Sequence, residues 1–379
     1  MHQTTILTNA NLVLPTETVA GTIVFEGDCI ADIQPGRSHL PSALDMDGDT
    51  LMPGVVDVHT DNLERQVQPR SMARWPSRSA MVAHDAQCAA AGVTTVLDAL
   101  CLGDLGFDKD RIQTFRDGVV DLDALGHAGL LKADHFLHLR CEVPAIDVLA
   151  LFDPVADHPL VRMISLMDHS PGVGQYFDLD HYRKLRRKDG ITEEFIERRI
   201  VEMQAHRARW RTPNRTALLE RIKGLPIAIA SHDDRTEEEI AENYADGIRI
   251  SEFPVTLTAA KAAKQAGMQV IAGAPNIVRG GSHSGNVAAR DLVQAGAVDA
   301  FASDYVPSSL VEAAFRCAHQ EGLSLSDSVA LVSDRPAQMA GLPDRGRLQP
   351  GKRADVVRVR VLPDLPVVRQ VWRAGERVI

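Results

Sequence analysis

Eight short apolar runs alternate with helical stretches through the middle of the chain, and this alternation limits the possible folds more than any other feature. The runs lie at residues 54–59, 93–98, 135–142, 161–168, 226–231, 248–252, 269–273 and 299–303. Apolar runs separated by helices are typical of parallel strands whose crossover connections cover the sheet. Eight such units predict an α/β fold, the (β/α)8 TIM barrel.

The two ends of the chain have a different pattern. "TILTNANLVL" and "GTIVFEGDCIADIQPG" near the start, and "KRADVVRVRV" and "LPVVRQVWRAGERVI" near the end, are short strand-like runs punctuated by Gly and Asp. Such runs are typical of small antiparallel sheets. We therefore expect a small β-sandwich domain built from both chain ends, residues 1–53 and 344–379, and a barrel domain at residues 54–343.

Composition narrows the class of protein. The chain is 45% hydrophobic and 24% charged, and it has no run of the roughly 18–20 apolar residues that cross a membrane. Its start lacks a signal-peptide pattern, and its five cysteines form no CxxC pair, so we expect a cytoplasmic enzyme. A net charge of -10 argues against nucleic acid as a partner. A small polyanion could still bind a local cluster of arginines.

Potential metal ligands stand at the ends of several predicted strands. They are His59, Glu142, His169, His232, Glu252 and Asp304, and Asp61 follows His59 by two residues. Because the carboxyl ends of barrel strands meet at one mouth, these side chains should converge. Imidazole and carboxylate ligands suit one or two divalent ions, zinc first, with manganese or iron as alternatives. Asp304 could also accept a proton from an attacking water.

Each of these residues also has a purely structural interpretation. His59 could be a capped loop residue, with Asp61 starting the next helix, and Glu142 could pair with Arg140. His169 could be a turn residue, and Glu252 could begin a helix. The charged helical segment 181–223 is predicted to be a solvent-exposed insertion between the fourth and fifth strands. It could instead contact a partner subunit, which would make the protein a homo-oligomer.

Two further segments suit anions. "NIVRGGSHSGN", residues 276–286, follows the seventh strand and carries Arg279, Gly280, Gly281, Ser282 and His283. Backbone amides of paired glycines beside a helix N-terminus favour phosphate, although a plain glycine-rich turn is the alternative. The second segment follows Asp61 and could neutralise a polyphosphate, although each of its arginines alone could be a surface ion pair. Its arginines are Arg65, Arg70, Arg74 and Arg78.

Taken together, these residues resemble the amidohydrolase superfamily over essentially the whole chain, through "PGVVDVH", the strand-end ligands and "GRLQPGKRADVV". "HTDNLERQVQPR", "GVTTVLDAL", "SEFPVT", "GAPNIVRGGSHSGN" and "ASDYVPSSL" more narrowly resemble the PhnM family of the carbon–phosphorus lyase pathway. That resemblance implies a divalent-metal-dependent hydrolysis of α-D-ribose 1-methylphosphonate 5-triphosphate to the 5-phosphate and pyrophosphate.

The resemblance also implies roles for individual residues. Asp304 and His283 would be catalytic, and Glu252 stands at the sixth-strand end, where the superfamily's deacetylase branch has a histidine. The implied metal ligands are His59, Asp61, Glu142, His169, His232 and Asp304, with Glu252 as a further candidate. The implied substrate-binding residues are Asn62, Arg65, Arg70, Arg279, Gly280, Gly281 and Ser282.

Two rival functions make different predictions. An amidohydrolase that acts on an amide or N-acyl bond would have a mostly neutral pocket and no need for the loop from Arg279 to His283. A non-catalytic amidohydrolase-like scaffold would have lost metal ligands, whereas the sequence offers a full set.

Replacing His283 tests the phosphate-facing role of the glycine-rich loop. We predict that His283→Ala lowers turnover but leaves the metal in place, because His283 would stabilise charge on the departing phosphate. Turnover and elemental analysis of the purified variant check this. Loss of metal from the variant would contradict a role confined to phosphate.

Overall fold

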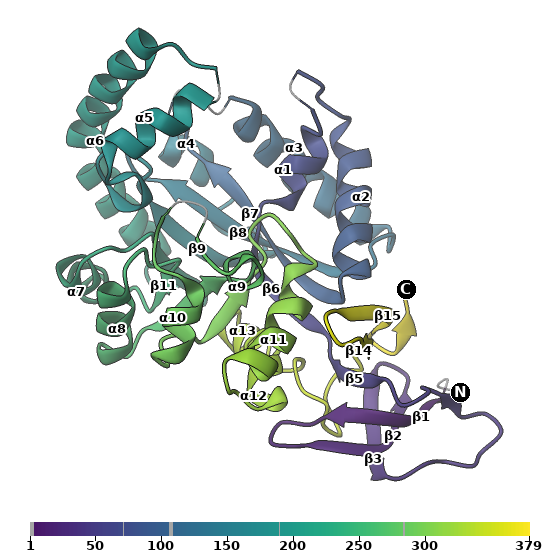
Figure 1. Ribbon diagram of the computed structural model, residues 1–379. Helices are drawn as coiled ribbons and strands as arrows, with labels where there is room; N and C mark the ends of the chain where they lie inside the picture. Colours follow the sequence, from purple (N-terminus) through teal and green to yellow (C-terminus); the bar gives the residue numbers. More distant parts are fainter. Residues whose placement is uncertain (1–3, 71, 106–108, 189, 283–284) are drawn as a thin grey trace.

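The computed structural model describes residues 4–70, 72–105, 109–188, 190–282 and 285–379. It contains two separate eight-stranded sheets. One is the sheet of the barrel, and the other joins strands from both ends of the chain (Figure 1). The predicted fold class, a parallel α/β barrel with a β-domain built from both ends, is thereby confirmed.

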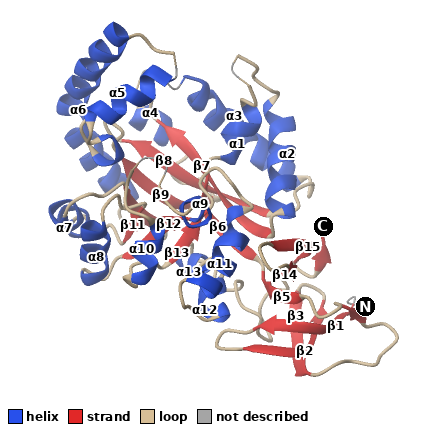
Figure 2. Ribbon diagram, in the orientation of Figure 1, coloured by secondary structure: helices blue, strands red, loops and turns tan. Residues whose placement is uncertain are grey.

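The barrel strands follow one another in chain order, and each pairs in parallel with the next (Figure 2). All eight predicted strands are present. Their bounds are β6 Val55–Thr60, β7 Val93–Leu102, β8 Asp134–Glu142, β9 Val161–Met167, β10 Ala228–His232, β11 Ile250–Glu252, β12 Gln269–Gly273 and β13 Ala300–Ala302. Every residue of β6 and β7 is buried, because helices cover the outside of the sheet and side chains fill its inside. The inner filling includes Val58, Leu97, Met163 and Ile250.

Backbone hydrogen bonds around Asp304 close the barrel between its first and last strands. The Asp304 N–H donates to the carbonyl of His59 at 3.0 Å, and the Asp61 N–H donates to the carbonyl of Asp304 at 2.5 Å. Below this bridge, one carboxylate oxygen of the buried Asp57 accepts from the backbone N–H of Ser303 at 3.1 Å and of His59 at 3.3 Å. The ends of β6 and β13 are therefore held side by side.

The described helices lie mainly between successive strands. Their bounds are α1 Asn62–Val67, α2 Ser77–Ala90, α3 Lys109–His127, α4 Val148–Phe152, α5 Leu179–Lys188, α6 Glu193–Ile222, α7 Glu237–Ala245, α8 Leu257–Gln265, α9 Ala274–Arg279, α10 Ala289–Gln294, α11 Ser309–Gln320, α12 Leu325–Ala330 and α13 Asp334–Met339. Local sequence sets some boundaries: Thr236 and Glu239 form a capping box that starts α7. The predicted helical insertion is the pair α5 and α6, between β9 and β10. No described helix is long and apolar enough to span a membrane.

The second sheet combines the N-terminal strands with the last strands of the chain, in the order β16-β15-β14-β5-β1-β2-β3, with β4 beside β1. Its strands are β1 Thr4–Val13, β2 Thr18–Glu26, β3 Cys29–Pro35, β4 Leu44–Asp45, β5 Thr50–Pro53, β14 Val356–Val361, β15 Pro366–Arg373 and β16 Glu376–Arg377. β5 pairs with β14 in antiparallel fashion, which joins the two chain ends. Leu12, Phe25, Leu51 and Trp372 belong to the core of this domain.

One carboxylate ties the barrel to the C-terminal segment. Asp134, at the start of β8, forms ion pairs with Arg345 at 2.8 Å and with Arg373 at 3.3 Å, and a third with Arg353. Burial alone would raise the pKa of Asp134, but hydrogen bonds and charge from Arg353 and Arg345 lower it below its ordinary value. The carboxylate therefore stabilises the fold when it is ionised.

We predict that Asp134→Asn lowers the free energy of unfolding by about 2 kcal/mol, because it leaves partly buried arginines without their common partner. Urea unfolding at neutral pH measures the loss. The matched control is Asp153→Asn, which removes an exposed pair with Arg221 and should change stability little. Since the pKa of Asp134 is lowered, its contribution is complete above about pH 4 and is lost as the pH falls further. Equal stability of the two variants at pH 7 would contradict this role.

Candidate active site

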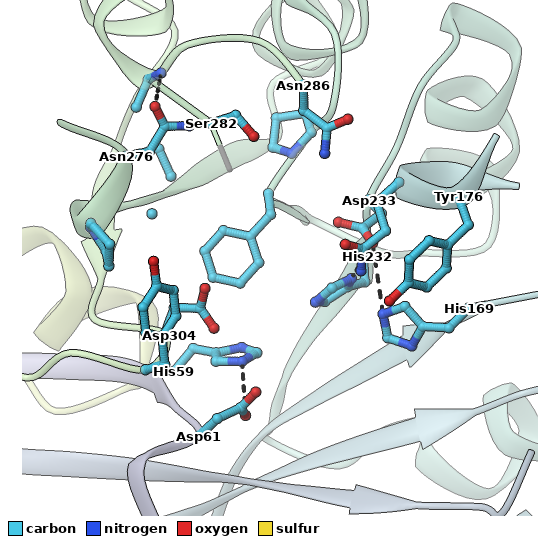
Figure 3. Close-up of a pocket in the computed structure, with 18 of the residues that line it drawn as sticks. His59, Asp61, His169, Tyr176, His232, Asp233, Asn276, Ser282, Asn286 and Asp304 are labelled. Carbon is cyan, nitrogen blue, oxygen red and sulfur yellow. Dashed lines mark hydrogen bonds and ion pairs between the residues drawn. The ribbon is translucent and has the colours of Figure 1, made fainter. Parts of the chain in front are cut away.

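A pocket of about 390 Å³ opens at the carboxyl ends of the barrel strands (Figure 3). Volumes of this order are typical of small-molecule sites. Most of the residues predicted from the sequence line it. They are His59, Asp61, Glu142, His169, His232, Arg279, Gly281, Ser282 and Asp304.

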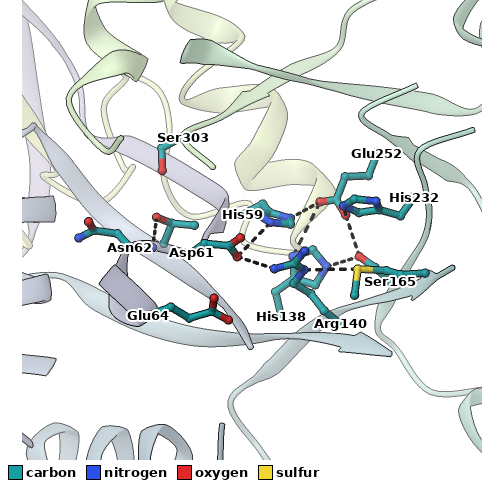
Figure 4. Close-up of polar contacts among 12 residues, drawn as sticks. His59, Asp61, Asn62, Glu64, His138, Arg140, Ser165, His232, Glu252 and Ser303 are labelled. Carbon is teal, nitrogen blue, oxygen red and sulfur yellow. Dashed lines mark hydrogen bonds and ion pairs between the residues drawn. The ribbon is translucent and has the colours of Figure 1, made fainter. Parts of the chain in front are cut away.

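The buried carboxylate of Glu252 holds the ring of His59 in place. Its Nδ1 lies 2.8 Å from Oε1 of Glu252, and its Nε2 lies 3.5 Å from Oδ1 of Asp61 (Figure 4). Ser165 donates to the other Glu252 oxygen at 2.9 Å. Although burial would lower the pKa of His59, Glu252 and Asp61 raise it to about 10. Glu252 is fully buried and is not among the residues that line the pocket. It therefore fixes the ring so that Nε2 faces the cavity.

Asp61 is paired with a buried arginine. Arg140, on β8, donates to Oδ1 of Asp61 at 2.6 Å, and Arg111, on α3, lies 3.7 Å from Oδ2. The pKa of Asp61 is well below its usual range, because the charge of Arg140 and the contact with His59 outweigh the effect of burial. Glu142, for which an ion pair with Arg140 was the structural alternative, instead contacts His169.

A second group of candidate ligands lies at the ends of β8, β9 and β10. A hydrogen bond joins Nδ1 of His169 to Oε1 of Glu142. Asp233, directly after β10, places Oδ2 3.7 Å from Nε2 of His169 and 3.3 Å from Nδ1 of His232. Figure 3 shows His169, His232 and Asp233 beside Tyr176, across the pocket from Asp304.

Three residues that follow barrel strands have left-handed backbones. The φ angles are 58° at Asp233, 53° at Phe253 and 55° at Asp304. Such values are uncommon for residues other than glycine and cost on the order of 1–3 kcal/mol each. The turns that carry Asp233 and Asp304 into the pocket therefore store strain where the side chains meet.

The donor atoms fit one or two divalent ions. One set is His59, Asp61 and Asp304, a second is His169, His232 and Asp233, and a third is His59, His232 and Glu252; within each set the ligand atoms lie within 4.8 Å of one another. Nδ1 of His232 and Oδ2 of Asp233 are buried and have no hydrogen-bond partner among the described residues. Both residues belong to the second set, and a cation bound by that set would satisfy both atoms.

Arginines from four different elements also line the pocket. They are Arg111 of α3, Arg140 of β8, Arg186 of α5 and Arg279 of α9. Asn276 and Ser282 lie on the wall made by α9 and the segment after it (Figure 3). Gly280 has a φ of 78° as it ends α9, which a side chain would strain, and it does not line the pocket.

Some predicted substrate-binding residues lie elsewhere. Asn62 is buried and contacts Nδ1 of His84 at 2.9 Å, because α1 begins at Asn62 and turns it towards α2. Arg65 donates to the carbonyl of Tyr305 at 2.7 Å, and Arg70 pairs with Ala73; neither lines the pocket. His283 lies outside the described residues.

Arg74 and Arg78, which also follow Asp61 in the sequence, form ion pairs with α3. Arg74 contacts Asp117 at 3.1 Å, and Arg78 contacts Asp121 at 2.9 Å. They therefore serve as structural ion pairs.

The pocket is also lined by residues that the sequence did not mark as candidates, among them Arg111, Tyr176, Arg186 and Asp233. Asp233 had a signal, because it follows His232 directly in "SHDD". Arg111, Tyr176 and Arg186 lie in connections whose path depends on tertiary packing, and no spacing in the sequence marks them.

Comparison with known proteins gives a consistent picture. The profile of the Amidohydrolase family matches residues 179–379. The chain is 42% identical over 376 residues to the α-D-ribose 1-methylphosphonate 5-triphosphate diphosphatase of Escherichia coli strain K12, covering 98% of this chain and 100% of that protein. Among solved structures, the N-acetyl-D-glucosamine-6-phosphate deacetylase of Mycobacterium smegmatis matches with a TM-score of 0.64 and 17% identity, covering 99% of this chain and 100% of that one.

The dihydropyrimidinase of Brevibacillus agri NCHU1002 matches with a TM-score of 0.63 and 13% identity, covering 100% of this chain and 95% of that one. At such low identity, these two structures establish the shared fold alone.

We predict that Glu252→Gln weakens zinc binding about 10- to 100-fold, because the neutral amide no longer stabilises and orients His59 as the carboxylate does. Titration of metal-free protein with zinc measures the affinity. Glu242→Gln, which alters an exposed carboxylate on α7 paired with Arg211, is the control and should bind zinc as the wild type does. Unchanged affinity in Glu252→Gln would contradict the orienting role. Complete loss of zinc, as from His59→Ala, would make Glu252 a ligand.

Proposed function

The chain belongs to the amidohydrolase family, together with the E. coli diphosphatase that it matches over its whole length, and from this premise we propose that it hydrolyses α-D-ribose 1-methylphosphonate 5-triphosphate to the 5-phosphate and pyrophosphate. The full-length match carries the proposal. The geometry of the pocket supports it independently, because metal-type ligands and several arginines face one cavity.

The residues that would hold metal are those of the two sets that line the pocket. His59, Asp61 and Asp304 would hold one ion, and His169, His232 and Asp233 a second. Zinc is our first candidate, and manganese or iron also suits these donors. A divalent ion bound there would lower the pKa of water and neutralise charge on a phosphoryl oxygen. Glu142 and Glu252 would orient His169 and His59 through their hydrogen bonds.

The reaction requires an acceptor for the proton of the attacking water. We assign this role to Asp304, whose carboxylate lines the pocket and whose backbone is fixed to β6 on both sides. Water would attack the α-phosphorus in line and transfer its proton to Asp304. The bond from that phosphorus to the bridging oxygen would break, and pyrophosphate would leave with the bond's electron pair.

Positively charged side chains in the pocket would stabilise the negative charge that develops on the phosphate oxygens. Arg279 and Ser282 line the wall that we assign to the departing pyrophosphate, with His283 beside them in the sequence. Gly281 also lines this wall, but its backbone N–H donates to the carbonyl of Asn276 at 3.0 Å. Arg111 lies 3.7 Å from Asp61, and it would therefore face the α-phosphate, which we place over the candidate metal ligands. Fixed donors of this kind act most strongly where charge develops in the transition state.

The rival functions have less support. An amide hydrolase has no need for arginines from four elements in its pocket. A non-catalytic scaffold would not be expected to keep strained turns that carry carboxylates into one cavity. The cytoplasmic location and the homo-oligomer considered from the sequence remain predictions.

We predict that protein loaded with zinc or manganese converts the phosphonate-ribose triphosphate to the 5-phosphate and pyrophosphate, as followed by phosphorus NMR. Protein treated with a chelator should be inactive and should recover when metal is restored. Orthophosphate as the released product would contradict attack at the α-phosphorus. Hydrolysis of N-acyl substrates without release of pyrophosphate would favour the amide-hydrolase function instead.

A further inference from the structure

The helical insertion supplies a basic side chain to the pocket. Arg186, near the end of α5, lines the cavity with Tyr176 of the short 3-10 helix η1, Gly174–Tyr176. The ring of Tyr176 lies 6.2 Å from the ring of His169, which places this wall beside the second group of metal ligands. The insertion that the sequence predicts as solvated is therefore also part of the site.

Aromatic contacts hold Arg186 in position. Its guanidinium lies 5.8 Å from the ring centroid of Tyr176 and 5.1 Å from that of Tyr182, and the two rings are 5.3 Å apart. Tyr182 is fully buried and packs with Ile196 and Ile200 of α6. An arginine that stacks on fixed rings loses little conformational freedom when it binds an anion.

The two walls of the pocket differ in chemistry. The apolar side chains of Leu105 and Met203 also line the cavity. The sulfur of Met203 accepts from the hydroxyl of Tyr182, whose ring lies beside Arg186, at 3.8 Å. On the opposite wall lie the polar side chains of Asn276 and Ser282 (Figure 3). The wall of Arg186 thus combines one cation with apolar side chains. The opposite wall carries Arg279 and Ser282 beside Asn276, whose amide also binds the backbone of Val287 and Ala289.

The substrate named for the E. coli relative carries a triphosphate at one end and a methylphosphonate at the other. The triphosphate end is a polyanion, whereas the methylphosphonate ester bears one negative charge and a methyl group. If the α-phosphorus lies over the metal ligands, the two ends must extend in different directions. The polyanion suits the polar wall, and the singly charged methyl-bearing group suits the wall of Arg186.

We propose, building on the proposed function, that Arg186 binds the methylphosphonate group of the substrate, with Leu105 and Met203 beside its methyl group. Arg186 is then a specificity-determining residue at the end of the pocket remote from the departing pyrophosphate. The insertion α5–α6 distinguishes phosphonate-bearing ribose triphosphates from other sugar triphosphates.

The test compares two substrates in metal-loaded Arg186→Met, which keeps much of the side-chain length and removes the charge. One substrate is α-D-ribose 1-methylphosphonate 5-triphosphate, and the other is 1-O-methyl-ribose 5-triphosphate, which lacks the phosphonate. Release of pyrophosphate gives kcat/KM for each. We expect the variant to lose about 10- to 100-fold in kcat/KM on the first substrate and to stay within about twofold of wild type on the second. Lys184→Met, at an exposed position of the same helix, is the control and should change neither.

An unchanged kcat/KM on the second substrate would show that the variant is folded and holds its metal. Equal losses on both substrates, or no loss on either, would overturn the assignment of Arg186 and leave the proposed function intact. Release of pyrophosphate from neither substrate by the wild-type protein would overturn the proposed function and this assignment together.

Discussion

Two backbone hydrogen bonds join Asp304 to the chain on either side of Thr60, and they close the barrel at the mouth of the pocket. The same bonds bring together His59, Asp61 and Asp304, a set whose donor atoms could hold a metal ion. The contacts that close the barrel therefore also assemble this candidate metal site. Asp57 strengthens this junction from inside the protein, because it accepts the backbone N–H groups of both strands. The left-handed backbone of Asp304 is stabilised by this closure and aims its carboxylate into the cavity.

The closure places an aspartate where many metal hydrolases have the second histidine of a His-x-His pair, and this changes the charge of the site. Asp61 adds negative charge beside Asp304, and the buried Arg140 balances it at 2.6 Å. A carboxylate-rich site favours hard cations but repels a polyphosphate. The arginines that line the pocket offset this repulsion. In the proposed function, the carboxylates that suit a metal ion and the arginines that suit a phosphate group therefore depend on each other.

The sequence predicts the barrel well, because strands buried on both faces read as continuous apolar runs and their carboxyl ends meet at one edge. For that reason the strand-end residues His59, Glu142, His169, His232 and Asp304 all reach the pocket. The sequence does not predict which way a side chain turns once a helix begins, so Asn62 faces α2 instead. Nor does it predict the contribution of Arg186, because its position depends on how a long insertion packs over the barrel.

In the proposed reaction, water attacks the α-phosphorus at a metal centre held by the first and last strands of the barrel. Hydrolysis in water labelled with oxygen-18, followed by mass spectrometry of both products, tests it most directly. We predict that one labelled oxygen enters the 5-phosphate of the ribose product and that pyrophosphate stays unlabelled. Label in pyrophosphate would place the attack on the β-phosphorus and would contradict the account.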